Sequence, residues 1–454
     1  MNNQSSDLDV VVVGAGFAGL TVARKLKEAG VSVVVLEADD RVGGRSMPGS
    51  LAGHVVDLGG QWLGTGQPHL LALSEELGVE TYPQYFAGEH IVDVVGREAR
   101  YREGEDLPLE PADLEEFNKL MGELEAVAGK LDVAAPWTVA GADGFDAQTF
   151  ESWLVGATAS EPARAVFRLI AQTIFCVQPG QLSPLTVLYH AAADGGIGHM
   201  ISTVGGAQET LFLGGAWQLA AKMAEALGDA VIVNAPVRSI AQSADGVTVT
   251  SDAGVWTAAM AVVATAPPMA GRISYSPPMP PRRDALTLRM PMGSIIKVHV
   301  AYETPFWRAK GLSGCILSDR TVTGMWYDNG HPGVETGRIV GFFGGGHAQA
   351  WAERSPEERR AQVLEDLATY LGPEANTPID YVEQSWPAAP WQRGAYMAVP
   401  SPGALTAFGP ALRDPVGRIH WAGTETADVN IGYYDGAIQS GQRVADACIE
   451  RLKS

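Results

Sequence analysis

The sequence is poor in cysteine. Its three cysteines, Cys176, Cys315 and Cys448, lie far apart in a chain of 454 residues. A sparse and odd number of cysteines favours reduced thiols over a disulfide framework or a zinc site. We therefore predict no metal centre and treat the three side chains as small apolar residues.

The sequence also lacks a long hydrophobic run, although 46% of its residues are hydrophobic. Residues 1–7 contain neither a basic nor an apolar region of the kind that begins a secretory signal. No window reaches the roughly 18 apolar residues that a membrane helix needs. We therefore expect a soluble, cytoplasmic protein that does not bind a membrane.

Positive charge is scarce, because 32 lysines and arginines face 52 aspartates and glutamates, a formal net charge of -20. Nucleic acids and anionic membranes attract cations, so this balance disfavours both as partners. A chain of this length can bury a large core, and its size favours two domains over one. The composition thus predicts a two-domain protein without a nucleic-acid partner.

The first 37 residues carry a dinucleotide-binding pattern. An apolar run at 10–13 is followed by the turn Gly-Ala-Gly-Phe-Ala-Gly at 14–19, a helical stretch and a second apolar run at 31–36. In this pattern Gly14 permits a tight turn, Gly16 a close approach to a pyrophosphate, and Gly19 close packing of helix on strand. The glycine-rich turn alone does not exclude a purely structural turn.

Glu37 makes the pattern more specific, because it ends the second apolar run. A carboxylate there can accept both hydroxyls of an adenosine ribose and would repel the 2′-phosphate of NADP. Residues 40–45 add glycines and two guanidinium groups, Arg41 and Arg45, which suit anionic oxygens. Together with Glu37, this segment favours an adenine dinucleotide site over a plain surface loop.

These residues resemble the opening of the FAD-binding amine oxidase family, which includes monoamine, polyamine and L-amino-acid oxidases. The resemblance continues through 57–62, 234–237, 265–268 and 421–426, and so covers almost the whole chain. It implies FAD as the cofactor. The cofactor-binding residues that it implies are Gly14, Gly16, Gly19, Glu37, Arg41, Gly44, Arg45, Gly60, Gln61, Trp62, Val237, Trp386, Gly423, Glu425 and Tyr433.

Segments with dinucleotide-domain character occur at the start, in the middle and at the end of the chain. The middle one has an alternating run at 247–250 followed by a buried-strand pattern at 261–264, and the last is an amphipathic helix ending near 452. We predict an α/β plus α+β fold with a Rossmann-like FAD domain of residues 7–90, 210–290 and 395–454. Residues 91–209 and 291–394 are predicted to form an interleaved substrate domain, as in amine oxidases and p-hydroxybenzoate hydroxylase.

The resemblance implies three catalytic residues, Lys297, Tyr396 and Tyr433. Lys297 lies in an apolar strand pattern, where a lysine needs a partner, and it matches a family lysine that holds water near the flavin and assists reaction with oxygen. A lysine that extends its charge to the surface is the alternative. The two tyrosines match an aromatic cage that aligns the amine, the alternative being two ordinary core tyrosines.

The flavin attachment is predicted to be non-covalent. Ala395 stands where animal monoamine oxidases carry the cysteine that bonds to the flavin. With no thiol at this position, the chain should hold FAD by non-covalent contacts alone.

The resemblance also implies a mainly apolar substrate wall with one amide, which favours a hydrophobic or aromatic amine. Residues 60–66 contain no arginine of the kind that amino-acid oxidases use for a carboxylate. The substrate-binding residues predicted in this way are Phe175, Cys176, Ile201, Gln208, Met325, Tyr327, Tyr396 and Tyr433.

The predicted reaction is oxidation of a primary or secondary amine by oxygen, giving an aldehyde or ketone and hydrogen peroxide. Polyamine, diamine or amino-acid oxidation within the same family is an alternative, as is a flavin desaturase or porphyrinogen-type oxidase that does not act on amines. A flavin-binding protein without turnover is a third possibility. The sequence does not decide the oligomeric state and leaves a homodimer open.

Overall fold

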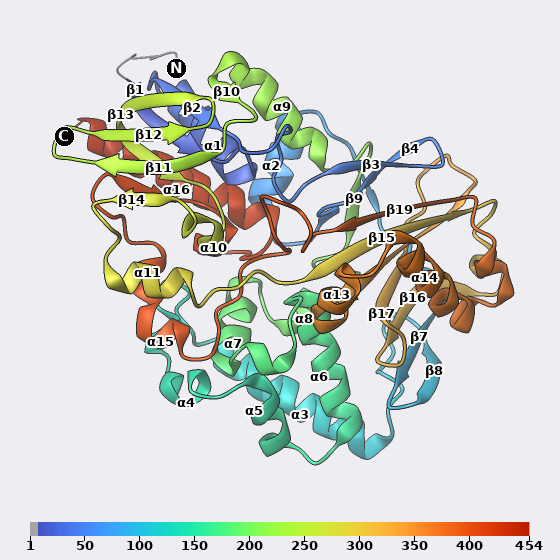
Figure 1. Cartoon of the computed structure of the whole chain (residues 1–454). Coiled ribbons are helices and arrows are strands. Elements are labelled where there is room, and N and C mark those ends of the chain that lie inside the picture. Colours follow the sequence, from blue (N-terminus) through green and yellow to red (C-terminus); the bar gives the residue numbers. More distant parts are fainter. Residues whose placement is uncertain (1–7, 454) are drawn as a thin grey trace.

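The computed structural model describes residues 8–453 and contains two large sheets and a layer of helices (Figure 1). The first sheet has the strand order β10-β2-β1-β13-β12-β11-β14, with β20 paired to β13. Its strands are β1 (Leu8–Val13), β2 (Val33–Leu36), β10 (Val231–Ile232), β11 (Val237–Gln242), β12 (Val247–Ser251), β13 (Gly254–Val263), β14 (Ser274–Ser276) and β20 (Ile419–Trp421).

The centre of the first sheet is parallel, with β1 between β2 and β13. Residues 10–13 are buried, which explains why these positions form a continuous apolar run rather than an alternating one. The alternating run at 247–250 lies in β12, which forms an antiparallel hairpin with β13. Its second strand is longer than expected, because it runs on without a break into the central parallel strand.

Helices α1 (Phe17–Glu28) and α16 (Tyr434–Lys453) lie side by side on the first sheet, with α2 (Pro68–Glu76) and α9 (Trp217–Leu227) nearby (Figure 1). The predicted final helix is confirmed, and its buried face includes Ile438, Val444 and Cys448. At Gly441 an added Cβ would lie 2.6 Å from the Ala18 carbonyl oxygen, so the glycine lets the two helices approach closely.

The second sheet has the strand order β19-β15-β18-β17-β16-β7-β8. Helices α13 (Gly345–Ala352) and α14 (Pro356–Leu371) accompany it (Figure 1). Every residue of β15 is buried, so this strand runs through the interior. The strands are β7 (Glu89–Val94), β8 (Arg97–Tyr101), β15 (Ile295–Tyr302), β16 (Leu312–Ser318), β17 (Thr323–Asp328), β18 (Gly337–Gly344) and β19 (Asp380–Ser385).

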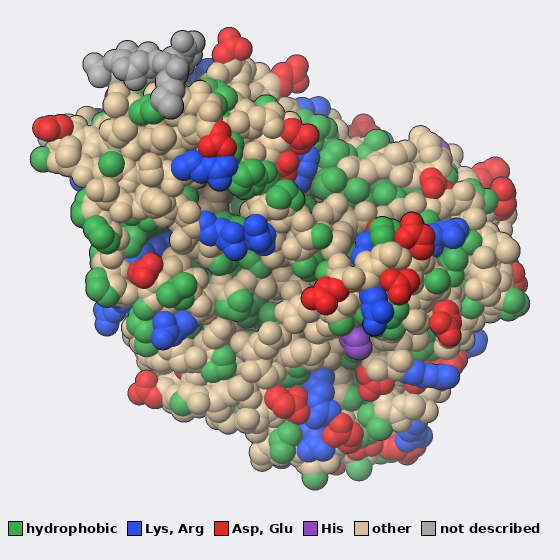
Figure 2. Space-filling model, viewed as in Figure 1, with side chains coloured by type: hydrophobic (Ala, Val, Ile, Leu, Met, Phe, Trp, Pro, Cys, Tyr) green, Lys and Arg blue, Asp and Glu red, His purple; other side chains and the backbone are tan. Residues whose placement is uncertain are grey.

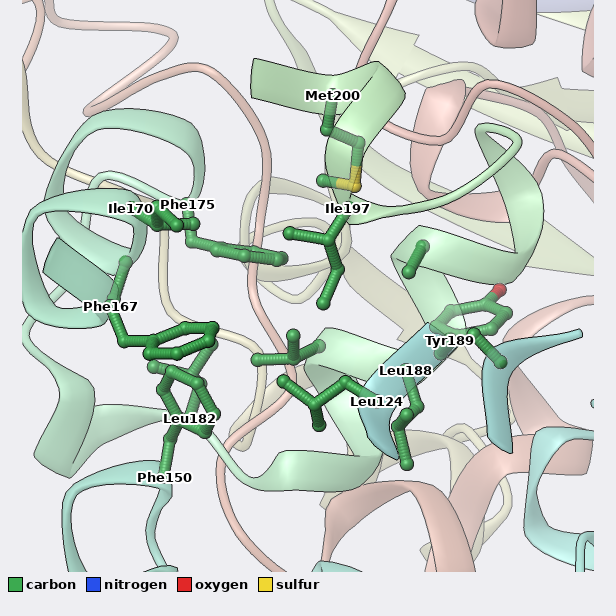
Figure 3. Packing of buried hydrophobic residues seen from close by; sticks show 14 of the residues in the cluster. Leu124, Phe150, Phe167, Ile170, Phe175, Leu182, Leu188, Tyr189, Ile197 and Met200 are labelled. Atoms are coloured by element: carbon green, nitrogen blue, oxygen red, sulfur yellow. The ribbon is translucent and has the colours of Figure 1, made fainter. Parts of the chain in front are cut away.

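The helical layer packs around an apolar core whose side chains point toward one another from several helices (Figure 3). Leu124, Phe167 and Leu188 are among its almost completely buried members. The helices are α3 (Pro111–Ala128), α4 (Ala142–Asp146), α5 (Phe150–Ala157), α6 (Glu161–Ile174), α7 (Pro184–Ala193) and α8 (Ile197–Ile201).

Shorter elements connect these layers. The remaining strands are β3 (Pro48–Leu51), β4 (His54–Asp57), β5 (Trp62–Leu63), β6 (Thr81–Pro83) and β9 (Thr210–Phe212). The remaining α-helices are α10 (Pro267–Ala270), α11 (Pro281–Thr287), α12 (Phe306–Ala309) and α15 (Ala404–Phe408). Single 3₁₀ turns are η1 (Pro136–Thr138), η2 (Pro179–Gln181), η3 (Gly228–Ala230), η4 (Pro373–Asn376), η5 (Gly409–Leu412) and η6 (Thr424–Thr426).

The chain passes repeatedly between the two sheets. The first sheet takes strands from 8–36, 231–276 and 419–421, and the second takes strands from 89–101 and 295–385. This arrangement is the predicted α/β unit interleaved with a second unit, while the domain limits themselves stay a prediction. Acidic and basic side chains are interspersed on the face shown in Figure 2. Within residues 8–453, none of the helices combines the length and hydrophobicity needed to cross a bilayer.

Candidate active site

Two cavities meet in the middle of the molecule. The first, of about 530 Å³, follows the carboxyl ends of β1 and β2, and the second, of about 250 Å³, lies among β16–β18, α6 and α8. The two cavities share part of their walls, so they adjoin. The shared lining residues are Arg45, Tyr396, Gly432, Tyr433 and Tyr434.

The glycine-rich turn after β1 forms one wall of the first cavity. Gly14 and Gly16 line it, and Gly14 has a φ of +101°, which favours glycine. Gly16 is the N-cap residue of α1 and has no side chain that could bond the first N–H groups of the helix. A Cβ added there would meet nothing within 4 Å, so the space in front of these groups is open. The free N–H groups of the α1 amino terminus therefore suit a phosphate at this point.

Gly19 does not line the cavity and serves packing instead. A Cβ at this position would lie 2.0 Å from the carbonyl oxygen of Gly14, a backbone atom that cannot move aside cheaply. Hence α1 can approach the turn closely only if residue 19 is glycine.

Replacing Gly19 by alanine is expected to lower the free energy of unfolding by about 1–3 kcal/mol, because the added methyl group overpacks the turn. Gly122, on the exposed side of α3, is the matched control, since a Cβ there meets nothing within 4 Å. Gly122→Ala should stabilise by about 0.5–1 kcal/mol through helix propensity. Thermal unfolding compares the two variants, and a G19A protein as stable as wild type would contradict this role.

Glu37 faces the first cavity just after β2. Its Oε2 accepts a hydrogen bond from the Ala15 N–H at 2.6 Å and its Oε1 one from the Asp39 N–H at 2.9 Å. Burial raises the pKa of Glu37, and these two backbone hydrogen bonds oppose the rise. Each oxygen keeps capacity to accept a further donor, as two ribose hydroxyls would require. Val237 lies on the same wall.

Arg41 does not line either cavity, in contrast to its predicted role at anionic oxygens. Its guanidinium donates to the carbonyl oxygens of Ser46 at 2.8 Å and Gly44 at 3.0 Å. These bonds hold the glycine loop in shape. Gly44 itself lines the first cavity, so Arg41 acts there through the loop.

Arg45 lies where the two cavities meet. Its Nη1 donates to the Tyr396 carbonyl oxygen at 2.7 Å and to Glu425 Oε1 at 2.7 Å. Glu425 is buried behind the walls, whereas Gly423 lines the first cavity. Burial alone would raise the pKa of Glu425, but Arg45 together with backbone hydrogen bonds, one of them from Ala398, lowers it. The ion pair therefore joins the loop at 45 to the segment at 425.

Lys297 reaches the second cavity from β15. Its Nζ donates to the Gly59 carbonyl oxygen at 2.7 Å and to Gln61 Oε1 at 2.6 Å. The side chain is 3% exposed, which rules out a lysine that extends to the surface. Burial lowers the pKa of Lys297, and the charge of Asp57 opposes this shift. The Nζ thus has two neutral acceptors, and within residues 8–453 no carboxylate forms an ion pair with it, although the charge of Asp57 is near enough to act on it.

Aromatic rings surround Lys297. Its Nζ lies 5.9 Å from the ring centroids of both Trp62 and Phe342. Gly60 and Gln61 also line the second cavity. Trp386 completes this wall and is held by a hydrogen bond from its Nε1 to the Leu58 carbonyl oxygen at 3.1 Å.

Tyr396 and Tyr433 line both cavities. Burial raises the pKa of both phenols well above the usual value, so both rings stay neutral. The structure thus brings the two tyrosines to one junction, although they come from segments 37 residues apart in the sequence. Neutral phenol rings at this junction can orient an amine through their faces.

Besides Tyr396 and Tyr433, four further predicted substrate residues line the second cavity, namely Ile201, Gln208, Met325 and Tyr327. Gln208 Nε2 donates to the Met200 carbonyl oxygen at 3.1 Å, whereas its buried Oε1 has no partner among the described residues. An unpaired buried acceptor costs free energy, so a donor from a bound molecule would be favourable here.

Phe175 and Cys176, predicted as substrate-binding residues, are not among the lining residues of either cavity. Phe175 turns into the helical core, where its ring meets His190 edge to face at 5.3 Å (Figure 3). Cys176 is fully buried, with its thiol directed to the Thr173 carbonyl oxygen. Both follow the end of α6, and Cys176 packs behind the cavity wall, in one cluster with Met325 and Tyr396.

The face of α6 that borders the second cavity contributes residues that the sequence did not single out. They recur at the spacing of one helix side, which is the same pattern that core packing produces. The sequence therefore contains no signal to separate them from core residues. The additional lining residues include Val166, Ile170, Thr173 and Ile174 of α6, together with Phe86, Tyr101, Leu107 and Cys315.

Charge is nearly absent from the second cavity. None of its described lining residues is an aspartate or a glutamate, and its only cations are Arg45 and Lys297. Arg45 is already neutralised by Glu425. The cavity is therefore best suited to a neutral, largely apolar molecule.

Comparison with known proteins gives consistent matches over the whole chain. The family described as flavin containing amine oxidoreductase matches residues 17–449. A probable flavin-containing monoamine oxidase A of Dictyostelium discoideum is 38% identical over 446 residues, covering 98% of both chains. Two solved structures have a TM-score of 0.94: putrescine oxidase bound to putrescine, 36% identical over 98% of this chain and 100% of the other, and cyclohexylamine oxidase from Brevibacterium oxydans IH-35A, 33% identical over 99% and 100%.

Proposed function

The chain belongs to the flavin containing amine oxidoreductases, enzymes that oxidise amines, and on this premise we propose that it uses FAD and oxygen to oxidise hydrophobic or aromatic primary or secondary amines. The observation that carries the proposal is the second cavity, which is apolar, free of carboxylates among its described lining residues, and closed by two tyrosines where it meets the first cavity.

The first cavity supports FAD as the particular flavin. An adenine dinucleotide needs acceptors for its ribose and donors for its two phosphates. Glu37 offers the acceptors, and the open amino terminus of α1 at Gly16 offers the donors. The volume of about 530 Å³ extends from this turn to the tyrosine pair, as an extended dinucleotide requires.

A bound flavin supplies the redox chemistry, namely uptake of a hydride from the carbon beside the amine nitrogen and return of the electrons to oxygen as hydrogen peroxide. The protein's part is to bind the amine without its extra proton. An alkylamine has a pKa of about 10 in water, and burial in an apolar cavity disfavours the ammonium form. The resulting imine hydrolyses to an aldehyde or ketone.

Substrate orientation is assigned to three side chains. The ring faces of Tyr396 and Tyr433 align the amine at the junction of the cavities, and the free Oε1 of Gln208 accepts a hydrogen bond from its N–H. Lys297 is assigned to the oxygen reaction, because its buried charge stabilises negative charge that develops on oxygen.

The charges that line the second cavity favour monoamines over the other substrate classes of the family. A diamine or polyamine would bring a second ammonium group into a cavity without a described carboxylate. An amino acid would bring a carboxylate to Arg45, whose charge Glu425 already neutralises. Both classes are therefore expected to be poorer substrates than apolar monoamines.

A peroxide-coupled activity screen tests the substrate class. Aromatic and alicyclic monoamines are expected to give kcat/KM values at least about a hundred-fold above those of diamines of similar length, because burying an unpaired charge is costly. Amino acids with the same apolar side chains are the matched comparison for a carboxylate. Diamines turned over as efficiently as monoamines would overturn the assignment.

The flavin is proposed to be held non-covalently. Ala395 lines the second cavity and offers no thiol for a bond to the cofactor. Acid precipitation of the purified yellow protein is expected to release the flavin into the supernatant. Yellow colour that stays with the denatured pellet would contradict this expectation.

A further inference from the structure

A third cavity, of about 220 Å³, lies at the edge of the first sheet, among α10, α11 and β14. Figure 1 shows these three elements below β11, at the β14 edge of the first sheet. Ile273 lines both this cavity and the first one, so the two are neighbours. Neither catalytic tyrosine nor Lys297 touches it.

Arg283 of α11 places a buried charge on the wall of this third cavity. Its side chain is held on one edge, since Nη1 donates to the carbonyl oxygens of Ala411 at 2.7 Å and Leu412 at 2.8 Å. The guanidinium carbon lies 3.7 Å from the centre of the Trp421 ring. The residue as a whole is only 3% exposed.

The other edge of this guanidinium is free. The buried Nε has no hydrogen-bond partner in the part of the chain that the structure describes, and both hydrogen bonds of the side chain use Nη1. No carboxylate within residues 8–453 forms an ion pair with Arg283, and Asp284, at the rim of the cavity, is exposed. Burial lowers the pKa of Arg283 to about 10, which leaves it protonated near neutral pH.

A buried, unpaired cation is costly unless an anion compensates it. Nη2 makes no hydrogen bond within residues 8–453, so its N–H groups are the ones left to bind an oxygen of a carboxylate or phosphate. We propose that the third cavity is a binding site for a small oxyanion, a carboxylate or a phosphate-type anion, held by the free edge of Arg283. This site is separate from the one proposed for the amine.

A carboxylate introduced next to Arg283 is expected to occupy the proposed anion site. Thr287 lines the cavity four residues after Arg283, so the two side chains share one face of α11. In Thr287→Glu a tethered carboxylate takes the place of the free anion. Thr287→Gln is the matched control, because it has a similar size and no charge.

The experiment follows the melting temperature of the flavin-loaded enzyme with increasing sulfate, phosphate or acetate, with chloride keeping the ionic strength constant. In wild type and T287Q we expect a saturating rise of roughly 1–2 °C, as for a ligand that binds only the folded state. In T287E the rise should be lost. A larger rise in melting temperature with sulfate or phosphate than with acetate indicates a phosphate-type anion, and the reverse indicates a carboxylate.

Arg283→Met should lose the rise as well, while Arg282→Met, at an exposed neighbour, should keep it. If R283M does not fold, because Ala411 and Leu412 lose their donor, the comparison of T287E with T287Q still decides the question. Salts that are merely excluded from the protein surface would stabilise all variants equally. An equal rise in wild type and T287E, or no saturating rise in wild type, overturns the proposal.

Discussion

Replacing Lys297 by methionine is expected to slow the reaction of the reduced enzyme with oxygen by about a hundred-fold, the typical effect of losing one preorganised charge-stabilising group. Methionine keeps an apolar stem of similar length and removes the ammonium group. Among the described lining residues of the second cavity, Lys297 is the only cation without a carboxylate partner, since Arg45 is paired with Glu425. Reduction of the enzyme by amine should change by less than roughly three-fold, because uncharged substrate does not need that charge.

Stopped-flow kinetics separates the two half-reactions. Anaerobic mixing with amine measures reduction, and mixing the reduced enzyme with oxygenated buffer measures reoxidation. Lys297→Arg, which keeps a charge, should recover part of the oxygen reaction. Equal slowing of both half-reactions in K297M would remove the assigned role of this lysine.

The pH dependence gives a second readout for Lys297. Burial lowers its pKa, against the opposing charge of Asp57, so the side chain loses its proton at a lower pH than a lysine in water. Below the lowered pKa the charge is present, and above it the charge is lost. The reoxidation rate of wild type should therefore fall as pH rises through that pKa, while K297M should lack this step.

Replacing Tyr433 by alanine is expected to lower kcat/KM for an apolar amine on the order of 10²-fold, since loss of a positioning ring lets the amine move out of the reactive orientation. Tyr433 lines both cavities, so under the proposed function its ring lies where amine and flavin are expected to meet. The loss should fall on reduction by amine and spare reoxidation. This is the reverse of the effect expected for K297M.

Tyr433→Phe is the matched control, because it keeps the ring and removes only the hydroxyl. If the ring face orients the amine, Y433F should stay within roughly three-fold of wild type, as expected where only a secondary contact is lost. An alanine variant with an unchanged rate would exclude the aromatic cage. A phenylalanine variant as slow as Y433A would transfer the role to the hydroxyl.

The parts of the site that the sequence could predict depend on local patterns. A strand, a glycine turn and a helix follow one another within residues 8–28, so the roles of Gly14 and Gly16 in the turn can be inferred from spacing. Lys297 can be singled out for a similar reason, because it is a charged residue within an apolar strand pattern. In the structure its Nζ donates hydrogen bonds to the Gly59 carbonyl oxygen and to Gln61 Oε1, which are the acceptors that a buried lysine needs.

Other parts depend on contacts between distant segments, which the sequence does not encode locally. Arg41 and Arg45 lie in the same loop, yet only Arg45 reaches Glu425, 380 residues away. Phe175 and Cys176 lie outside both cavity linings for a similar reason, because the direction of a side chain just beyond a helix end depends on how the helix packs. The domain limits, the individual residue roles, the cytoplasmic location and the oligomeric state stay predictions.

The proposed function requires that the bound flavin takes electrons directly from an apolar amine. Anaerobic addition of an aromatic or alicyclic monoamine to the purified enzyme tests it most directly, with the visible absorbance of the flavin as the signal. We expect rapid bleaching that returns to full colour when oxygen is admitted. A flavin that stays oxidised with every amine class would contradict the claim and favour a flavin-binding protein without turnover.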